Sequence, residues 1–309
     1  MDQQVLSTLE LVAQVFQHLD GGSLMRCRKV NTLFDLVAQE EWRARVHAHT
    51  APFVCDVSHF YFLLGGVEGV VSGSTALAVI LSGSEFDGFL QPTSDLDVYL
   101  PTEVGRDEIV RHLVSSEGYR VDSGTTSSGE ELWKRKPDTI ISLTRLTRVA
   151  GDVKHSVDIV VGTDHAATTP ILSFWGSLVM NYISETSIVC LYPRLTLRGR
   201  FFTRPGIQAD IISDPLQKYI DRGFHRVHRT QHSGFCGSRQ SYCPGRFRFT
   251  EDAASMRVDW QSRGGAYLPY GLRSPSSVPS AYWKWSTCTR VIYDKPYEDT
   301  SDGCVVGRL

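Results

Sequence analysis

Two aspartates stand one residue apart in the short apolar segment 94–100. Because alternate residues of a β-strand point to the same face, we expect Asp95 and Asp97 to project side by side, while Leu96 and Val98 face the core. Adjacent carboxylates repel each other unless a cation neutralises them, and Mg²⁺ prefers oxygen ligands of this kind. The doublet therefore predicts a divalent metal site on a strand.

A third aspartate and a turn of small residues accompany this doublet. Asp158 is the only acid in the apolar run 156–161, and Gly73-Ser74 separates the apolar residues 70–71 from a helical pattern that ends at Leu81. Backbone N–H groups at the start of a helix can approach a phosphate closely when no large side chain intervenes. The sequence thus combines three carboxylates with a turn suited to an anion.

The order of these segments resembles the nucleotidyltransferase fold of the DNA polymerase beta-like superfamily, over roughly residues 65–165. The resemblance is sharper to a group of fungal proteins of unassigned activity that join an F-box-like start to this domain. Their Ser-Gly-Ser-x-Ala-Leu and Ser-Asp-Leu-Asp segments stand here at 72–77 and 94–97. The similarity implies a mixed sheet with helices in which Asp158 lies on a strand beside that of Asp95.

The same resemblance implies a role for each site residue. Asp95, Asp97 and Asp158 would hold two Mg²⁺ ions and form the catalytic set, while Gly73 and Ser74 would grip the phosphates of a nucleoside triphosphate. The implied reaction is in-line attack of an acceptor hydroxyl on the α-phosphate, with pyrophosphate as the leaving group. Asp158 would also help to activate that hydroxyl.

Residues 5–47 show an apolar repeat with helical spacing, interrupted by Asp20-Gly21-Gly22-Ser23. This segment resembles an F-box, whose helices bury one face in the Skp-type adaptor of a cullin ubiquitin ligase. The proline that is usual near the start of an F-box is absent, and Thr8 stands at about its place. A helical hairpin that only packs on the following domain is the alternative.

The second part of the chain is basic. Residues 1–193 hold 14 basic and 24 acidic side chains, whereas residues 194–309 hold 18 basic and 10 acidic ones, a net charge of +8. A cationic segment of this kind suits nucleic acid or polyphosphate, although arginines scattered over a solvated surface give the same count. A group of histidines and cysteines in the same region could bind zinc, but its spacing matches no standard finger. Its members are His225, His228, His232, Cys236 and Cys243.

The 309 residues, 41% of them apolar, predict an α+β protein in three parts. We expect an F-box-like helical segment at 1–50, a nucleotidyltransferase-like domain at 51–200 and a basic, irregular extension at 201–309. Residues 171–184 have the pattern of a helix. Seven dispersed cysteines without a preceding signal peptide favour a cytoplasmic or nuclear protein, and glycines and charges interrupt the longest apolar run, which excludes a membrane span.

Two functions follow from these observations. The chain is an Mg²⁺-dependent nucleotidyltransferase, or it is a non-catalytic adaptor that recruits substrates to a ubiquitin ligase and uses the nucleotidyltransferase-like fold as a binding surface. A fold that keeps its carboxylates can lack activity, so the two hypotheses are separate.

Overall fold

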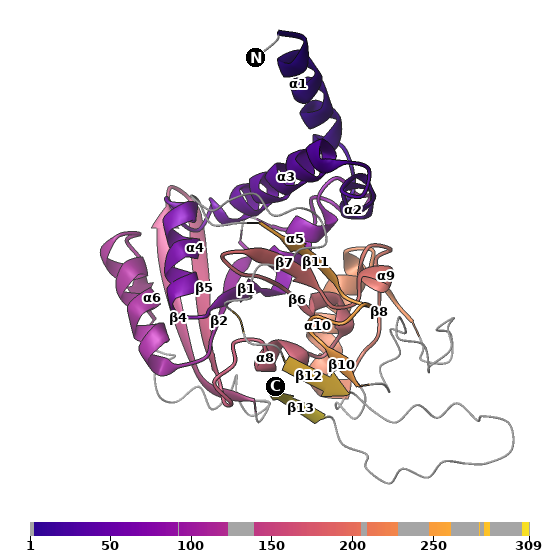
Figure 1. Ribbon diagram of the computed structural model, residues 1–309. Helices are drawn as coiled ribbons and strands as arrows, with labels where there is room; N and C mark the ends of the chain where they lie inside the picture. The colour runs from indigo at the N-terminus through magenta and orange to yellow at the C-terminus, as the bar shows by residue number, and fades with distance from the viewer. Residues whose placement is uncertain are drawn as a thin grey trace, which may run out of the picture.

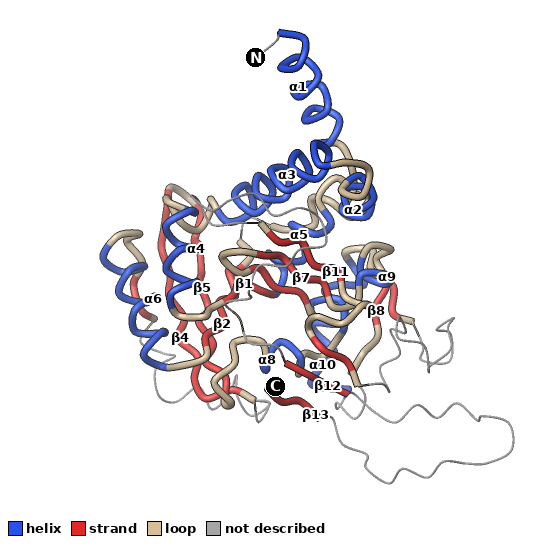
Figure 2. The backbone as a smooth tube through the Cα atoms, viewed as in Figure 1, coloured by secondary structure: helices blue, strands red, loops and turns tan. Residues whose placement is uncertain are grey.

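The computed structural model describes residues 3–91, 93–122, 139–204, 209–227, 247–260, 278, 281–284 and 305–308. These residues form an α+β fold around one eight-stranded mixed sheet (Figure 1, Figure 2). The order of the strands across this sheet is β11 (Met256–Asp259), β7 (Ser187–Cys190), β6 (Asn181–Ile183), β1 (Val70–Ser72), β2 (Asp95–Leu100), β5 (Val153–Gly162), β4 (Ile140–Ala150) and β3 (Arg120–Val121).

β2 and β5 are the parallel pair of this sheet, and its other neighbouring strands are antiparallel. After β2 the chain passes through α6 (Glu103–Ser115) and β3 before β4 and β5 form a long hairpin. Gly151 closes that hairpin with a φ of 61°, a backbone conformation that glycine adopts without a steric penalty. Asp158 lies on the strand beside that of Asp95, as expected.

Residues 5–47 are helical, as predicted. They form α1 (Gln3–Gln17), α2 (Gly21–Cys27) and α3 (Thr32–Thr50), and a further helix, α4 (Val57–Gly66), follows outside the predicted range. The Asp20 side chain accepts a hydrogen bond from the Ser23 N–H at 2.7 Å, and Asn31 accepts one from the Phe34 N–H at 2.8 Å. Such N-caps satisfy amides that have no partner within the helix, which explains why the apolar repeat is interrupted there.

The described residues form three apolar clusters, and the two larger ones lie on opposite faces of the sheet. The first core joins Leu24 of α2 and Trp42 of α3 to Leu96 and Val98 of β2, so the prediction that these two residues face the core is confirmed. Burial of Trp42 alone contributes on the order of 3–5 kcal/mol. Residues on both sides of position 50 share this core, and the division into three parts stays a prediction.

The second core lies on the face of Tyr99. It contains α8 (Thr169–Leu172) and Trp283 of β12 (Ala281–Lys284), which forms a small sheet with β10 (Arg248–Phe249) and β13 (Val305–Arg308). The remaining elements among the described residues are α5 (Gly73–Leu81), η1 (Ser177–Val179), α9 (Pro193–Thr196), α10 (Ala209–Asp221) and the paired strands β8 (Arg200–Phe201) and β9 (His225–Arg226).

The expected helix at 171–184 is wrong. The α-helix α8 ends at Leu172, a single 3-10 turn follows at Ser177–Val179 (η1), and β6 begins at Asn181. The described parts of 201–309 also add an edge strand, β11, to the main sheet, so they are more ordered than the predicted irregular extension. In the described part of the chain, no helix combines the length and the hydropathy that a bilayer crossing requires.

Candidate metal centre

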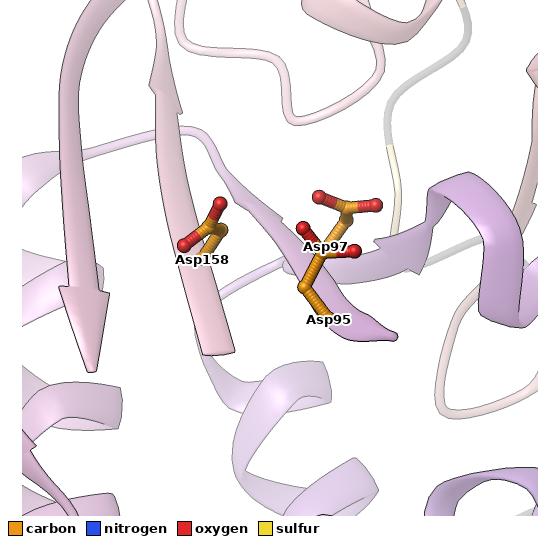
Figure 3. A group of neighbouring side chains, drawn as sticks. All are labelled: Asp95, Asp97 and Asp158. Atoms are coloured by element: carbon orange, nitrogen blue, oxygen red, sulfur yellow. The ribbon is translucent and has the colours of Figure 1, made fainter. Parts of the chain in front are cut away.

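The pairing of β2 with β5 brings the three predicted carboxylates together. Asp97 and Asp158 are direct partners in the parallel register, and Asp95 precedes Asp97 by two residues on the same face. One ligand atom from each carboxylate lies within 4.8 Å of those of the other two. Figure 3 shows the three side chains, from two neighbouring strands, turned toward a common space. The prediction that these acids share one site agrees with this geometry.

The glycine-serine turn meets the cluster from β1. Ser72 is the register partner of Asp97, and α5 (Gly73–Leu81) begins at the next residue. Gly73 has a φ of +64°, and a Cβ on it would lie 1.9 Å from Asp97 Oδ2. Any larger residue would therefore displace the carboxylate, so the contact requires glycine. The positive end of the α5 dipole thus lies beside the acids, and Ser74 is buried next to it.

Asp95 and Asp97 have no hydrogen-bonding neighbour in the described structure. Neither carboxylate accepts a hydrogen bond from a residue that the structure describes. Burial, followed by the charges of Asp95 and Asp158, raises the pKa of Asp97 well above its usual value. Two carboxylates in this condition repel each other, and a cation bound between them would relieve that repulsion.

Asp158 differs from the other two acids because it is already paired. Arg145 of β4 is its register partner on the other side and donates through Nε to Oδ1 at 2.7 Å and through Nη2 to Oδ2 at 2.5 Å. The hydrogen bonds to Asp158 raise the pKa of Arg145, so the guanidinium stays charged. Sequence reasoning missed Arg145. Residues 142–148 read Ser-Leu-Thr-Arg-Leu-Thr-Arg and do not alternate, so only the pairing of β4 with β5 places Arg145 on this face.

α10 adds a basic and aromatic surface near the cluster. Lys218 lies close enough to Asp97 for its charge to lower the pKa of that carboxyl, against the larger effect of burial. Burial raises the pKa of the Tyr219 hydroxyl, the charge of Arg222 opposes this shift, and the charges of Asp97 and Asp95 add to it. The Arg222 guanidinium lies 5.3 Å from the Tyr219 ring centroid and 5.4 Å from that of Phe89.

The other predicted sites in the basic region are not supported by the described residues. His225 is exposed on β9, and the four other members of the proposed zinc group lie outside the described residues. Arg248, counted among the cations that could contact nucleic acid, is 1% exposed and pairs with Asp252. Its guanidinium lies between the rings of Tyr192 and Trp283, at 4.9 and 5.1 Å. Arg248 therefore has a structural role.

The donor set fits a divalent cation that prefers oxygen. Three carboxylates within reach of one ion, two of them without hydrogen bonds among the described residues, match the ligands of Mg²⁺ or Mn²⁺ and lack the nitrogen and sulfur that zinc favours. Gly73 and Ser74 are buried at the start of α5, and Gly73 is in contact with Asp97. Comparison with models of known protein families finds no match to this chain, and a search of curated proteins finds none either.

Proposed function

We propose that this protein is an Mg²⁺-dependent nucleotidyltransferase. The observation that carries the proposal is the convergence of Asp95, Asp97 and Asp158 to within 4.8 Å beside the start of α5. A triphosphate needs positive charge along its length and backbone donors at its phosphates. The cluster, once loaded with metal, and the turn at Gly73 would supply both.

Each residue has a defined part in this proposal. Asp95, Asp97 and Asp158 would hold the metal, and the amides of Gly73 and Ser74 would hold the phosphates. The bound metal would neutralise phosphate charge and lower the pKa of the acceptor hydroxyl. The acceptor oxygen forms a bond to the α-phosphorus, the bond to the β-phosphate oxygen breaks, and pyrophosphate leaves. The exposed Lys218 would add positive charge at the edge of the site.

The sequence resemblance supports the same function. A glycine-serine turn, an aspartate doublet and a later strand aspartate occur in the order typical of the nucleotidyltransferase fold. In the structure these three features come from β1, β2 and β5, which are adjacent in the sheet. The acceptor and the preferred base stay open.

A titration with a fluorescent ATP analogue tests the proposal. The full-length protein should bind the analogue with Mg²⁺ and lose binding when EDTA replaces the metal. Asp95→Ala should abolish metal-dependent binding. Asp152→Ala, which removes an exposed carboxylate from the β4–β5 turn, is the matched control and should bind normally. Binding that is unaffected by EDTA and by Asp95→Ala would refute the proposed function.

Transfer of a labelled nucleotide then separates an enzyme from a binding protein. An α-labelled nucleoside triphosphate is incubated with the protein, Mg²⁺ and candidate acceptors. Label should appear in an acceptor with the wild type and not with Asp97→Ala. Metal-dependent binding without any transfer would favour a pseudoenzyme.

A second candidate function rests on the N-terminal helices. Figure 1 shows α1 projecting away from the sheet, and its Leu11 and Val15 side chains are 62% and 58% exposed. Val30, just before α3, is 62% exposed. Exposed apolar side chains on helices are typical of a partner surface. This supports docking of a Skp-type ubiquitin-ligase adaptor on residues 5–47, which would place the protein in the cytoplasm or the nucleus.

A further inference from the structure

The Arg145–Asp158 pair makes the three carboxylates unequal. Both oxygens of Asp158 accept hydrogen bonds from one guanidinium, whereas Asp95 and Asp97 accept none from the described residues. The strand of Asp158, β5, lies between β2 and β4. Asp158 is therefore opposite Asp97 in the parallel pairing with β2 and opposite Arg145 in the antiparallel pairing with β4. Arg145 therefore pairs directly with one ligand of the proposed metal site and, within the described structure, donates no hydrogen bond to the other two.

We propose that Arg145 controls how many divalent ions the site holds. One ion binds through Asp95 and Asp97 while the Arg145–Asp158 pair stays closed. A second ion, or a second ligand contact by Asp158, requires that pair to open. This inference rests on the proposed function only in taking the carboxylate cluster as a metal site.

The strength of the pair decides the order of binding. A bidentate arginine–carboxylate contact is among the stronger side-chain interactions, and the Asp158 side chain is 10% exposed, so little water competes with it. An ion that binds Asp158 must displace both hydrogen bonds. An ion that binds Asp95 and Asp97 displaces no hydrogen bond from a described residue and relieves their repulsion. The ion that binds Asp95 and Asp97 should therefore bind more tightly than the ion that binds Asp158.

Exposure indicates which partner moves. The Arg145 side chain is 32% exposed, three times the exposed fraction of Asp158. Asp158 is fixed by the parallel pairing of β5 with β2, whereas a long arginine side chain can swing toward solvent. Opening of the pair leaves Asp158 in place and exchanges its guanidinium for a metal ion. Arg145 is thus a positioning residue that acts through Asp158.

Mn²⁺ binding to the full-length protein, followed by the EPR signal of free Mn²⁺, tests this inference without any substrate. The wild type should bind one ion tightly and a second one weakly. Arg145→Gln should tighten the weak step by at least tenfold, because the second ion no longer has to displace two hydrogen bonds from a charged group. Arg145→Lys keeps the charge and loses the fork, so it should tighten this step less than Arg145→Gln does.

Arg111→Gln is the matched control. It removes the same charge from an exposed position on α6 and should leave both binding steps unchanged. Far-ultraviolet circular dichroism verifies that each variant is folded, and if Arg145→Gln is not, the result for Arg145→Lys decides. Unchanged or weakened Mn²⁺ binding in the folded Arg145 variants would overturn the inference.

Asp97→Ala separates this inference from the proposed function. If Asp97→Ala binds Mn²⁺ like the wild type, the cluster is not the metal site and both ideas fail. If Asp97→Ala abolishes binding and the Arg145 variants bind like the wild type, only the role of Arg145 is lost. Tightening of the weak step in Arg145→Gln, together with loss of binding in Asp97→Ala, would support both.

Discussion

Gly73 and Asp97 lie so close together that a Cβ on the glycine would stand 1.9 Å from the aspartate Oδ2. The glycine opens α5, and the aspartate belongs to β2, which pairs with β1 at Ser72. The turn that would hold phosphate and the carboxylate that would hold metal are therefore positioned by one contact. A change at either residue should affect both halves of the site.

Gly73→Ala should destabilise the protein and disturb the carboxylates together. Its φ of +64° is unfavourable for alanine, and the added methyl group must move Asp97. The first effect costs about 1–2 kcal/mol of unfolding free energy and the clash adds to it. Urea unfolding measures the stability, and Mn²⁺ titration measures the site, which should bind at least tenfold more weakly.

Gly151→Ala isolates the backbone effect. This glycine has a similar φ of +61°, but a Cβ there meets nothing within 4 Å. It should lose stability only through its backbone conformation and should keep wild-type Mn²⁺ affinity. Equal losses of stability and equal Mn²⁺ affinity in the two variants would show that the contact with Asp97 is unimportant.

Asp97→Asn should abolish Mn²⁺ binding and yet stabilise the metal-free protein. The neutral amide removes a charge that burial, and then the charges of Asp95 and Asp158, make unfavourable, as the raised pKa of Asp97 indicates, and a shift of one pKa unit corresponds to about 1.4 kcal/mol. We expect a gain of ~1 kcal/mol in unfolding free energy without metal. Thermal unfolding with and without Mn²⁺ measures both effects.

Asp35→Asn provides the contrast, because it has the opposite electrostatic surroundings. Asp35 is 1% exposed and accepts a hydrogen bond from Arg28 Nε at 2.6 Å. Breaking a buried pair of this kind costs ~3–5 kcal/mol. A loss of stability in Asp97→Asn that resembles the loss in Asp35→Asn would contradict the repulsion inferred at the cluster.

Sequence patterns predicted the local structure correctly where the type and spacing of a few residues determine it. Alternation along the strand placed Asp95 and Asp97 on one face and Leu96 and Val98 in the core, and the small residues at 72–74 located the start of α5. Adjacency of Asp158 came from the resemblance, since strand order is a long-range property that spacing does not reveal. The parallel register then brought the three acids together.

The positions of Arg145 and α10 depend on long-range packing, which local sequence patterns do not predict. The partner of Asp158 depends on which strand lies beside β5, and the surroundings of Lys218 depend on how α10 packs after more than a hundred intervening residues. The predicted helix at 171–184 failed for a related reason. Its apolar residues are buried on the sheet in short segments, and burial on all sides removes the periodicity that distinguishes helix from strand.

Acid should destabilise the protein through His112. Burial lowers the pKa of this histidine below 6.5, and the nearby His59 lowers it further, although Glu117 opposes the shift. The unfolded chain therefore binds the proton more readily, so this contribution to stability is complete above about pH 6.5 and is lost as the pH falls through the lowered pKa. Urea unfolding of the metal-free protein at several pH values between 7.5 and 5 measures the loss.

His112→Gln tests the assignment of that loss. The variant cannot take up the proton, so its unfolding free energy should fall less steeply between pH 6.5 and 5 than that of the wild type. Comparing the two proteins cancels the contributions of other titrating groups, including His49 and His155, whose pKa values burial also lowers. The same acid dependence in both proteins would assign the effect elsewhere.

Charged substitutions on α1 should prevent adaptor binding while leaving the fold intact. Leu11 and Val15 are exposed, so Leu11→Glu with Val15→Glu should change the unfolding free energy by about 0.5 kcal/mol or less per site. Capture of the full-length protein by an immobilised, purified Skp-type adaptor should fall at least tenfold, because a charge would then face the apolar surface of the partner.

Phe62→Glu is the matched control for that experiment. Phe62 lies on α4 and is 64% exposed, close to the value for Leu11, but it is outside residues 5–47. This variant should bind the adaptor like the wild type, because the predicted surface does not include α4. Equal capture of all three proteins would remove α1 from the interface, and no capture of the wild type would remove the adaptor function itself. Leu24 is unsuitable for the test because it is fully buried, and a charge there would unfold the helices.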